Sequence, residues 1–244
     1  MDILVLQHHD LEHLSILGDI LEERNFSYRY IRLHKNEKVP QKIEDLNEVK
    51  GIIILGGPMS VYETNKISWL KDEINLLKKI IPLDFPMFGI CLGSQLIAIA
   101  AGARVYPDQN NMEIGWSTIT LENISRKDSL HQKLPGSFKV FQWHGDTFNL
   151  PPKAKLLASS ELFKNQAFKI GKNIYAFQYH MEIKEKDIRN WLKEFSKDLR
   201  SSRCNVSPEK IIKDTQIFIE ETNEWGKEIF CNWLDLINLE KEGL

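Results

Sequence analysis

Short apolar segments alternate with segments of helical periodicity over residues 1–101, and this alternation limits the folds open to the chain more than any other feature. Strands are predicted at residues 3–7, 28–33, 51–55 and 85–90, and helices at residues 11–23, 67–80 and 92–101. This order is typical of a parallel sheet with helices on both faces. We therefore predict an α/β fold whose central sheet is mostly parallel and is flanked by helices.

The remainder of the chain changes character twice. Short strands separated by turns are predicted at residues 116–121, 138–143, 156–159, 167–170 and 173–178, so this part of the sheet is expected to be mixed. After Glu182 only helical periodicity remains, over residues 188–199 and 208–237. Ser207 and Pro208 are suited to start the second of these helices, and Gly226 is expected to split or bend it.

No internal repeat or linker of biased composition divides the chain. We expect residues 1–183 to form one domain and residues 184–244 to form a C-terminal helical extension that packs on the same domain. The extension carries a broad apolar stripe that includes Trp225 and Trp233. An alternative role for this stripe is a surface for another protein chain or for a second copy of this chain in a homo-oligomer.

Composition limits the partners that the chain can have. The 244 residues include 32 Lys and Arg against 34 Asp and Glu, so the net charge is −2 and no nucleic-acid partner is expected. Cys91, Cys204 and Cys231 are too few and too widely spaced for a disulfide framework, which indicates a reducing compartment. With no targeting segment and no apolar run of membrane-spanning length, the sequence predicts a soluble cytoplasmic protein without a membrane partner.

Cys91 stands between a predicted strand and a predicted helix, in the run FGICLGSQ. A residue on such a sharp turn is strained, and the neighbouring Gly89 and Gly93 let the backbone close up and a substrate approach. The helix N-terminus favours thiolate over thiol, and the thiolate is the nucleophilic form. We therefore interpret Cys91 as a catalytic nucleophile. The alternative is an inert buried cysteine.

His180 follows the predicted strand at residues 173–178, in the run YAFQYHME. Strand ends supply active sites in α/β sheets, and a cysteine nucleophile needs a base that is itself oriented by a third group. Residues two apart in extended chain point to the same side, so Glu182 can hydrogen-bond the His180 imidazole. Cys91, His180 and Glu182 thus form a candidate catalytic triad.

Five sequence blocks resemble, in the same order, those of class I glutamine amidotransferase domains, closest to the type found in GMP synthetase and its free-standing relatives. The blocks are ILGGPMSVYE at 54–63, FGICLGSQLIA at 88–98, EIGW at 113–116, FQWHGDTFNLP at 141–151 and QYHME at 178–182. Family members usually carry Phe and often Pro around the histidine, where this chain has Tyr179 and Met181. That departure bears on the shape of the pocket more than on the triad.

The resemblance implies a flavodoxin-like amidotransferase fold with a Cys-His-Glu triad and no cofactor or metal. It implies that the N–H groups of Gly57 and Leu92 form an oxyanion hole. It also implies that Gln95, with the backbone around Gly145 and Asp146, recognises glutamine. The expected reaction is hydrolysis of the glutamine side-chain amide through a γ-glutamyl thioester on the cysteine, which gives glutamate and ammonia.

The fate of the ammonia separates the activities that this resemblance allows. The sequence has no P-loop, so a separate synthetase subunit would have to use the ammonia. The alternative is a free-standing γ-glutamyl peptidase or hydrolase that acts alone on a γ-glutamyl compound. A binding or regulatory module without turnover is a third interpretation, which the intact triad disfavours.

Other polar residues are given lesser roles. His144 is ranked below His180 as a base, because its block resembles a substrate-binding loop. Glu113 is expected to be an ordinary loop carboxylate rather than a residue that shapes the pocket. His9 and His13 have the i, i+4 spacing of metal ligands, but no third ligand is evident and no metal site is expected.

Overall fold

The structure is a computed structural model that describes residues 2–201, 203–204 and 206–242. The strands are β1 (Ile3–Gln7), β2 (Tyr28–Arg32), β3 (Gly51–Ile54), β4 (Met87–Ile90), β5 (Val105–Pro107), β6 (Glu113–Leu121), β7 (Ser137–His144), β8 (Asp146–Phe148), β9 (Lys155–Ser160), β10 (Ala167–Ile170) and β11 (Ile174–Phe177). The α-helices are α1 (Ile16–Glu23), α2 (Ser68–Ile80), α3 (Leu92–Ala100), α4 (Glu185–Glu194) and α5 (Pro208–Glu242). Within the described residues, no helix has both the length and the apolar character that crossing a lipid bilayer requires.

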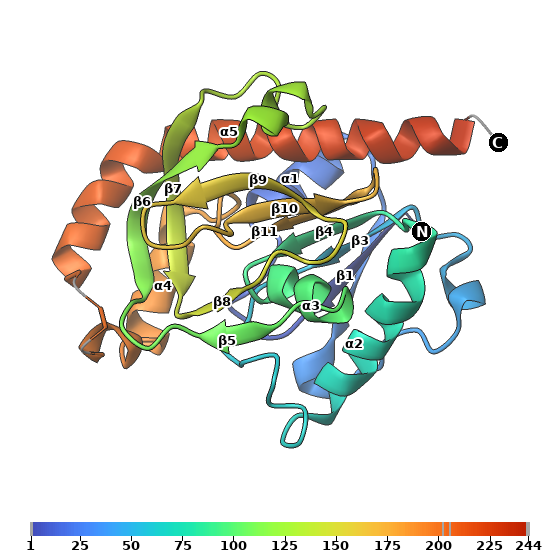
Figure 1. The fold of residues 1–244 in the computed structure, drawn as a ribbon, viewed down its shortest axis with the longest axis horizontal. Coiled ribbons are helices and arrows are strands. Elements are labelled where there is room, and N and C mark those ends of the chain that lie inside the picture. The colour runs from blue at the N-terminus through green and yellow to red at the C-terminus, as the bar shows by residue number, and fades with distance from the viewer. Residues whose placement is uncertain (1, 202, 205, 243–244) are drawn as a thin grey trace.

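A nine-stranded sheet forms the centre of the molecule, in the order β2-β1-β3-β4-β11-β10-β9-β6-β7 (Figure 1). From β2 to β11 all neighbouring strands are parallel, and from β11 to β7 all neighbours are antiparallel. β5 and β8 form a separate antiparallel pair that the sequence pattern does not predict, because strands this short show no clear period. The predicted α/β fold with a mixed central sheet is confirmed.

Alternate residues of the parallel strands enter two different hydrophobic clusters. In β1, Ile3 and Val5 belong to one cluster, whereas Leu4 and Leu6 belong to the other. Successive side chains of a strand point to opposite faces, so strands that are apolar throughout need cover on both faces. α1 and α5 supply that cover on the face of Val5, and α2 and α3 supply it on the opposite face (Figure 1).

Two predicted helices have different bounds in the structure. The first begins at Ile16 rather than residue 11, because Ser15 has a φ of 48° that interrupts helical geometry and leaves residues 11–15 in a turn. The helix predicted at residues 188–199 is α4 followed by a short 3-10 helix at Asp198–Arg200.

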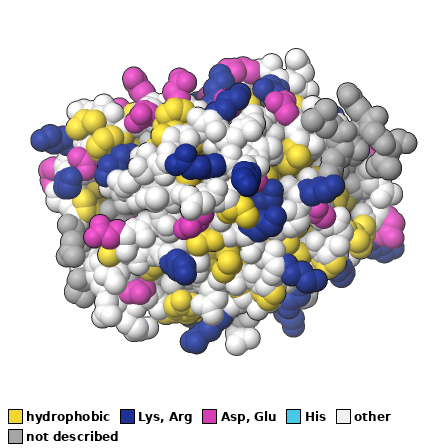
Figure 2. Space-filling view, turned by 45° about the horizontal axis from the view of Figure 1, so that its top comes forward, with side chains coloured by type: hydrophobic (Ala, Val, Ile, Leu, Met, Phe, Trp, Pro, Cys, Tyr) yellow, Lys and Arg dark blue, Asp and Glu magenta, His cyan; other side chains and the backbone are white. Residues whose placement is uncertain are grey.

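On the face shown in Figure 2, basic, acidic and apolar side chains are interspersed rather than gathered in one patch.

α5 is continuous through Gly226, so the helix is not split there, although Figure 1 shows its first turns at an angle to the longer remainder. The Phe230 and Trp233 rings lie 5.3 and 5.5 Å from the ring of Phe88 in β4. A Cβ atom on Gly226 would lie 2.6 Å from the carbonyl oxygen of Met181. Glycine therefore lets α5 approach the segment that follows β11, next to the candidate triad.

Candidate active site

The nucleophile elbow is formed where β4 meets α3. Cys91 has φ 50° and ψ −108°, a strained conformation for a residue with a side chain, and it is the N-cap of α3. Its N–H donates to the carbonyl oxygen of Phe177 in β11 at 2.7 Å, which holds the turn against the neighbouring strand. A Cβ atom on Gly93 would collide with the carbonyl oxygen of Ile54 in β3, so the first turn of α3 can only approach the sheet with glycine there.

His180 and Glu182 lie directly beyond β11 and are almost fully buried. The backbone of His180 exchanges hydrogen bonds of 2.8 and 3.2 Å with Phe141 of β7. Its side-chain Nδ1 lies 2.6 Å from Oε1 of Glu182, and Trp191 of α4 packs edge-on against the imidazole with ring centroids 4.8 Å apart. Both the backbone and the imidazole ring of His180 are thus held in place.

The charge state of His180 follows from its neighbours. Burial by itself would lower the pKa of His180, but the Glu182 carboxylate and the Cys91 thiol together hold that pKa well above its ordinary value. Nε2 of His180 is buried and has no nitrogen or oxygen partner among the described residues. Nε2 is therefore the ring nitrogen that remains available to the Cys91 thiol, whose hydrogen bond contributes to the raised pKa of His180.

A pocket of about 170 Å³ opens at the elbow. Its lining includes Cys91 and every residue predicted to contact substrate, namely Gly57, Leu92, Gln95, Gly145 and Asp146. Neither Gly57 N–H nor Leu92 N–H donates to a backbone acceptor among the residues that the structure describes. The structure thus brings together residues from several of the sequence blocks around one thiol.

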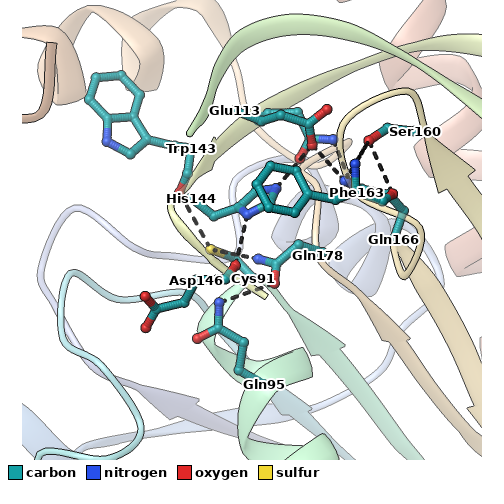
Figure 3. Close-up of polar contacts among 11 residues, drawn as sticks. Cys91, Gln95, Glu113, Trp143, His144, Asp146, Ser160, Phe163, Gln166 and Gln178 are labelled. Atoms are coloured by element: carbon teal, nitrogen blue, oxygen red, sulfur yellow. Dashed lines mark hydrogen bonds and ion pairs between the residues drawn. The ribbon is translucent and has the colours of Figure 1, made fainter. Parts of the chain in front are cut away.

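Gln95 and Cys91 are linked through Gln178, whose role the sequence analysis missed (Figure 3). The amide nitrogen of Gln95 donates to Oε1 of Gln178 at 3.1 Å, and the amide nitrogen of Gln178 lies 3.7 Å from the Cys91 sulfur. Gln178 is fully buried, next to β11. This chain of contacts sets the position of Gln95 relative to the thiol.

Glu113 is not the ordinary loop carboxylate that the sequence suggests. It begins β6 and is buried, with Oε2 3.2 Å from Nε2 of His144 and 2.6 Å from the donating amide of Gln166 (Figure 3). Nδ1 of His144 lies 2.9 Å from the carbonyl oxygen of Asp146. Both ring nitrogens of His144 are therefore engaged in shaping the pocket wall, which agrees with its rank below His180 as a base.

His8 supports the loop that carries Gly57. Its Nδ1 donates to the carbonyl oxygen of Gly56 at 3.0 Å, and its Nε2 lies 3.1 Å from the fully buried carboxylate of Glu73. Burial alone would lower the pKa of His8, but the Glu73 carboxylate, the hydrogen bond to Gly56 and the charge of Glu12 together raise it above its ordinary value. The peptide bond between Gly56 and Gly57 is trans, so its C=O and N–H groups point in opposite directions. The hydrogen bond that fixes the Gly56 carbonyl therefore also fixes the direction of the Gly57 N–H.

His9 and His13, which have the spacing of metal ligands, each contact other side chains. His13 lies 3.3 Å from the Asp187 carboxylate, which raises the pKa of His13 through a hydrogen bond. The His9 ring packs at a tilt against Phe195. Within the described part of the chain, no three His, Cys, Asp or Glu side chains are grouped so that they could hold a metal ion.

Residues outside the five blocks also reach the pocket. Glu12, in the turn before α1, lines it together with Phe195, Asp198 and Arg203 from the segment after α4. Asn223 of α5 donates to the carbonyl oxygens of Met181 and Ile183 at 2.9 and 3.0 Å, on either side of Glu182. The only sequence signal for Glu12 is its place just beyond the end of a parallel strand, and nothing in the sequence pattern identifies the others.

Comparison with known proteins agrees with this architecture. Residues 15–198 match the family model described as glutamine amidotransferase class-I, which is more than half of the chain. The chain therefore belongs to the class I glutamine amidotransferase family.

Individual relatives cover different activities. The chain is 35% identical over 160 residues to a glutamine-hydrolysing GMP synthase subunit from Sulfolobus acidocaldarius, covering 64% of this chain and 80% of that protein. It is 28% identical over 172 residues to γ-glutamyl peptidase 4 of Arabidopsis thaliana, covering 69% of this chain and 65% of that peptidase. The crystal structure of a glutamine amidotransferase from Thermotoga maritima matches with a TM-score of 0.84 and 30% identity, over 96% of this chain and 97% of that one.

Proposed function

We propose that the chain hydrolyses the side-chain amide of glutamine, with Cys91 as the nucleophile and His180, oriented by Glu182, as the acid and base. The observation that carries this proposal is the 2.6 Å contact between His180 and Glu182 beside a cysteine on a strained turn. A buried imidazole with a raised pKa next to a thiol favours the thiolate and imidazolium pair. That pair is the reactive form of a cysteine nucleophile.

In the first half of the proposed reaction, the Cys91 thiolate attacks the amide carbon of the glutamine side chain. The oxyanion that develops accepts hydrogen bonds from the N–H groups of Gly57 and Leu92, and loss of one such donor commonly lowers the rate about 10²–10³-fold. His180 gives its Nε2 proton to the leaving nitrogen, and the C–N bond breaks. Ammonia departs and a γ-glutamyl thioester remains on the sulfur.

In the second half, His180 takes a proton from water, and the water oxygen attacks the thioester carbon. The C–S bond breaks, glutamate leaves, and the thiolate and imidazolium are restored. Gln95 and the backbone at Gly145 and Asp146 are assigned to the glutamyl part of the substrate, because all of them line the pocket around the thiol.

The test is ammonia and glutamate release from glutamine by the purified chain. We expect equal release of both products by the wild-type chain and by Cys231→Ala, whose thiol is half-buried on α5 and does not line the pocket. Cys91→Ala should lose at least about 10³-fold in kcat, because the covalent route is gone. Full turnover by Cys91→Ala would refute the proposal.

A γ-glutamyl peptidase activity is the second candidate, and the segment after α4 favours it. Phe195, Asp198 and Arg203 extend the pocket lining beyond the residues that a simple amide requires. The acyl-enzyme chemistry is the same, and only the leaving group differs. Efficient release of amino acid from γ-glutamyl dipeptides by the chain alone would support this activity.

A separate synthetase subunit is the proposed user of ammonia if glutamine is the substrate. One relative is by name part of a glutamine-hydrolysing GMP synthase. A rise in glutaminase rate when a synthetase and its substrates are added would support this arrangement, and an unchanged rate would argue against it.

A further inference from the structure

Glu12 presents a buried carboxyl group that lacks a partner. The residue is 8% exposed and lines the pocket, and its carboxyl oxygens make no hydrogen bond or ion pair with any described residue. The backbone around it is held firmly: the Gln7 amide nitrogen donates to the Glu12 carbonyl oxygen at 3.0 Å, and Glu12 N–H donates to the His9 carbonyl oxygen at 3.1 Å. A buried polar group without a partner is costly, so it commonly marks a place where a ligand supplies the missing contact.

The Glu12 carboxyl group lies at the edge of the reacting centre. It lines the same pocket as Cys91 and Gly57. A Cβ atom on Gly56 would lie 2.5 Å from Oε2 of Glu12, so the carboxyl group packs directly on the glycine loop. It is also within the electrostatic influence of His180, which in the proposed mechanism must reach the leaving nitrogen. Glu12 is therefore a candidate to contact the leaving part of a substrate that the thiol attacks.

The charges around Glu12 decide which partner suits it. Burial and the Glu182 carboxylate raise the pKa of Glu12, whereas His180, His8 and His13 lower it, and the net result is a rise from 4.5 to about 7. Both the acid and the carboxylate have an oxygen that accepts a hydrogen bond. A carboxylate would repel an oxyanion, so the group that fits is a hydrogen-bond donor.

We propose that Glu12 is a further substrate-binding residue, whose carboxyl oxygen accepts a hydrogen bond from the N–H on the leaving side of the γ-glutamyl amide. This inference rests on the proposed function and narrows its substrate class. The site would take γ-glutamyl amides whose leaving nitrogen carries hydrogen, such as glutamine or a γ-glutamyl dipeptide. His180 adds a proton to that nitrogen while Glu12 holds one already attached to it.

The experiment compares glutamine with the γ-methyl ester of glutamate, whose leaving oxygen carries no hydrogen. Glu12→Ala should lower kcat/KM for glutamine about 10–100-fold, the usual cost of losing a hydrogen bond near charged groups. It should change kcat/KM for the ester less than about threefold. Glu12→Gln keeps an acceptor oxygen and the same shape, so it should restore most of the glutamine activity.

Asp10→Asn is the matched control, because Asp10 is an exposed carboxylate in the same turn and does not line the pocket. It should behave as the wild-type chain on both substrates. Equal losses on glutamine and on the ester in Glu12→Ala would overturn the inference, as would no loss on either. A wild-type chain that is inactive on both substrates would instead refute the proposed function, and with it this inference.

Discussion

Cys91 and His180, the proposed nucleophile and base, are held in place by different means. Cys91 is positioned by its own neighbours in the chain and by the backbone of two adjacent strands, through the Phe177 carbonyl and the close approach at Gly93. His180 and Glu182 depend on side chains from distant segments, such as Trp191 and Asn223. The elbow is therefore a local structure, and the base is a tertiary one.

The parallel core and the helical extension therefore contribute different things to the site. A strained turn needs a rigid sheet behind it, and the parallel core provides that sheet. An imidazole at the end of a strand needs its ring fixed, and the helical extension provides the packing: α4 contacts the ring, and α5 holds the carbonyl groups beside Glu182. Substitutions should therefore separate the two halves of the site.

The largest effect is expected on the base side, from Glu182→Gln. The amide lacks the negative charge that stabilises an imidazolium, so kcat on glutamine should fall about 10²–10⁴-fold, the usual contribution of general acid and base catalysis. Steady-state kinetics measure it, with Glu185→Gln on the exposed side of α4 as the control. An unchanged kcat in Glu182→Gln would remove Glu182 from the mechanism.

Gly93→Ala should disrupt the turn between β4 and α3 that carries Cys91. The added methyl group would meet the Ile54 carbonyl oxygen, so α3 must shift, and we expect a loss of about 3 kcal/mol or more in the free energy of unfolding. Urea denaturation measures this. Gly136→Ala, where a Cβ would meet nothing closer than 3.5 Å, should cost far less. Similar stabilities of the two variants would mean that the elbow tolerates adjustment.

Glu12→Gln should reveal a cost in stability that depends on pH. The pKa of Glu12 is raised from 4.5 to about 7, so the folded chain binds more protons than the unfolded chain between these values and loses stability as the pH rises through them. The glutamine variant has no such loss. Its advantage should be small near pH 4, grow up to pH 7, and reach about 1–3 kcal/mol above it. Parallel stability curves for the two chains would contradict a buried, raised Glu12.

The smallest effect is expected from Asn223→Ala, which tests whether α5 supports the segment around Glu182. Two hydrogen bonds to the segment around Glu182 are lost, so the chain should lose about 1–2 kcal/mol of stability and a few-fold in kcat, with KM nearly unchanged. Asn232→Ala removes only a contact to Glu228 on the same helix and serves as the control. A loss of stability without any change in kcat would show that α5 supports the fold but not the base.

Much of the fold and of the site can be predicted from the sequence where the signal is local. The elbow at Cys91 follows from an apolar strand, a thiol between glycines and a helix, all within residues 85–101. The contact between His180 and Glu182 is the one that their spacing of two residues predicts. The predicted start of α1 is wrong, since the helical pattern of residues 11–23 conceals the positive φ of Ser15.

Other features depend on contacts that no local pattern contains. The sequence indicates a mixed sheet but not the place of β11 between β4 and β10, since strand order is set by how crossovers pack. Glu113 resembles a loop carboxylate in the sequence because its partners His144 and Gln166 are far away in the chain. Glu12 and Asn223 give no clear signal of function for the same reason.

The α/β class, most of the strand and helix segments and the three residues proposed as a triad follow from the sequence, because periodicity, glycine placement and residue spacing act over a few residues. Which distant groups surround those residues depends on the tertiary structure. It placed Glu12 in the pocket of the thiol, His8 against the glycine loop and Asn223 against the segment around Glu182. Burial and charge at a site depend on everything that packs there, and packing joins residues that lie far apart in the chain.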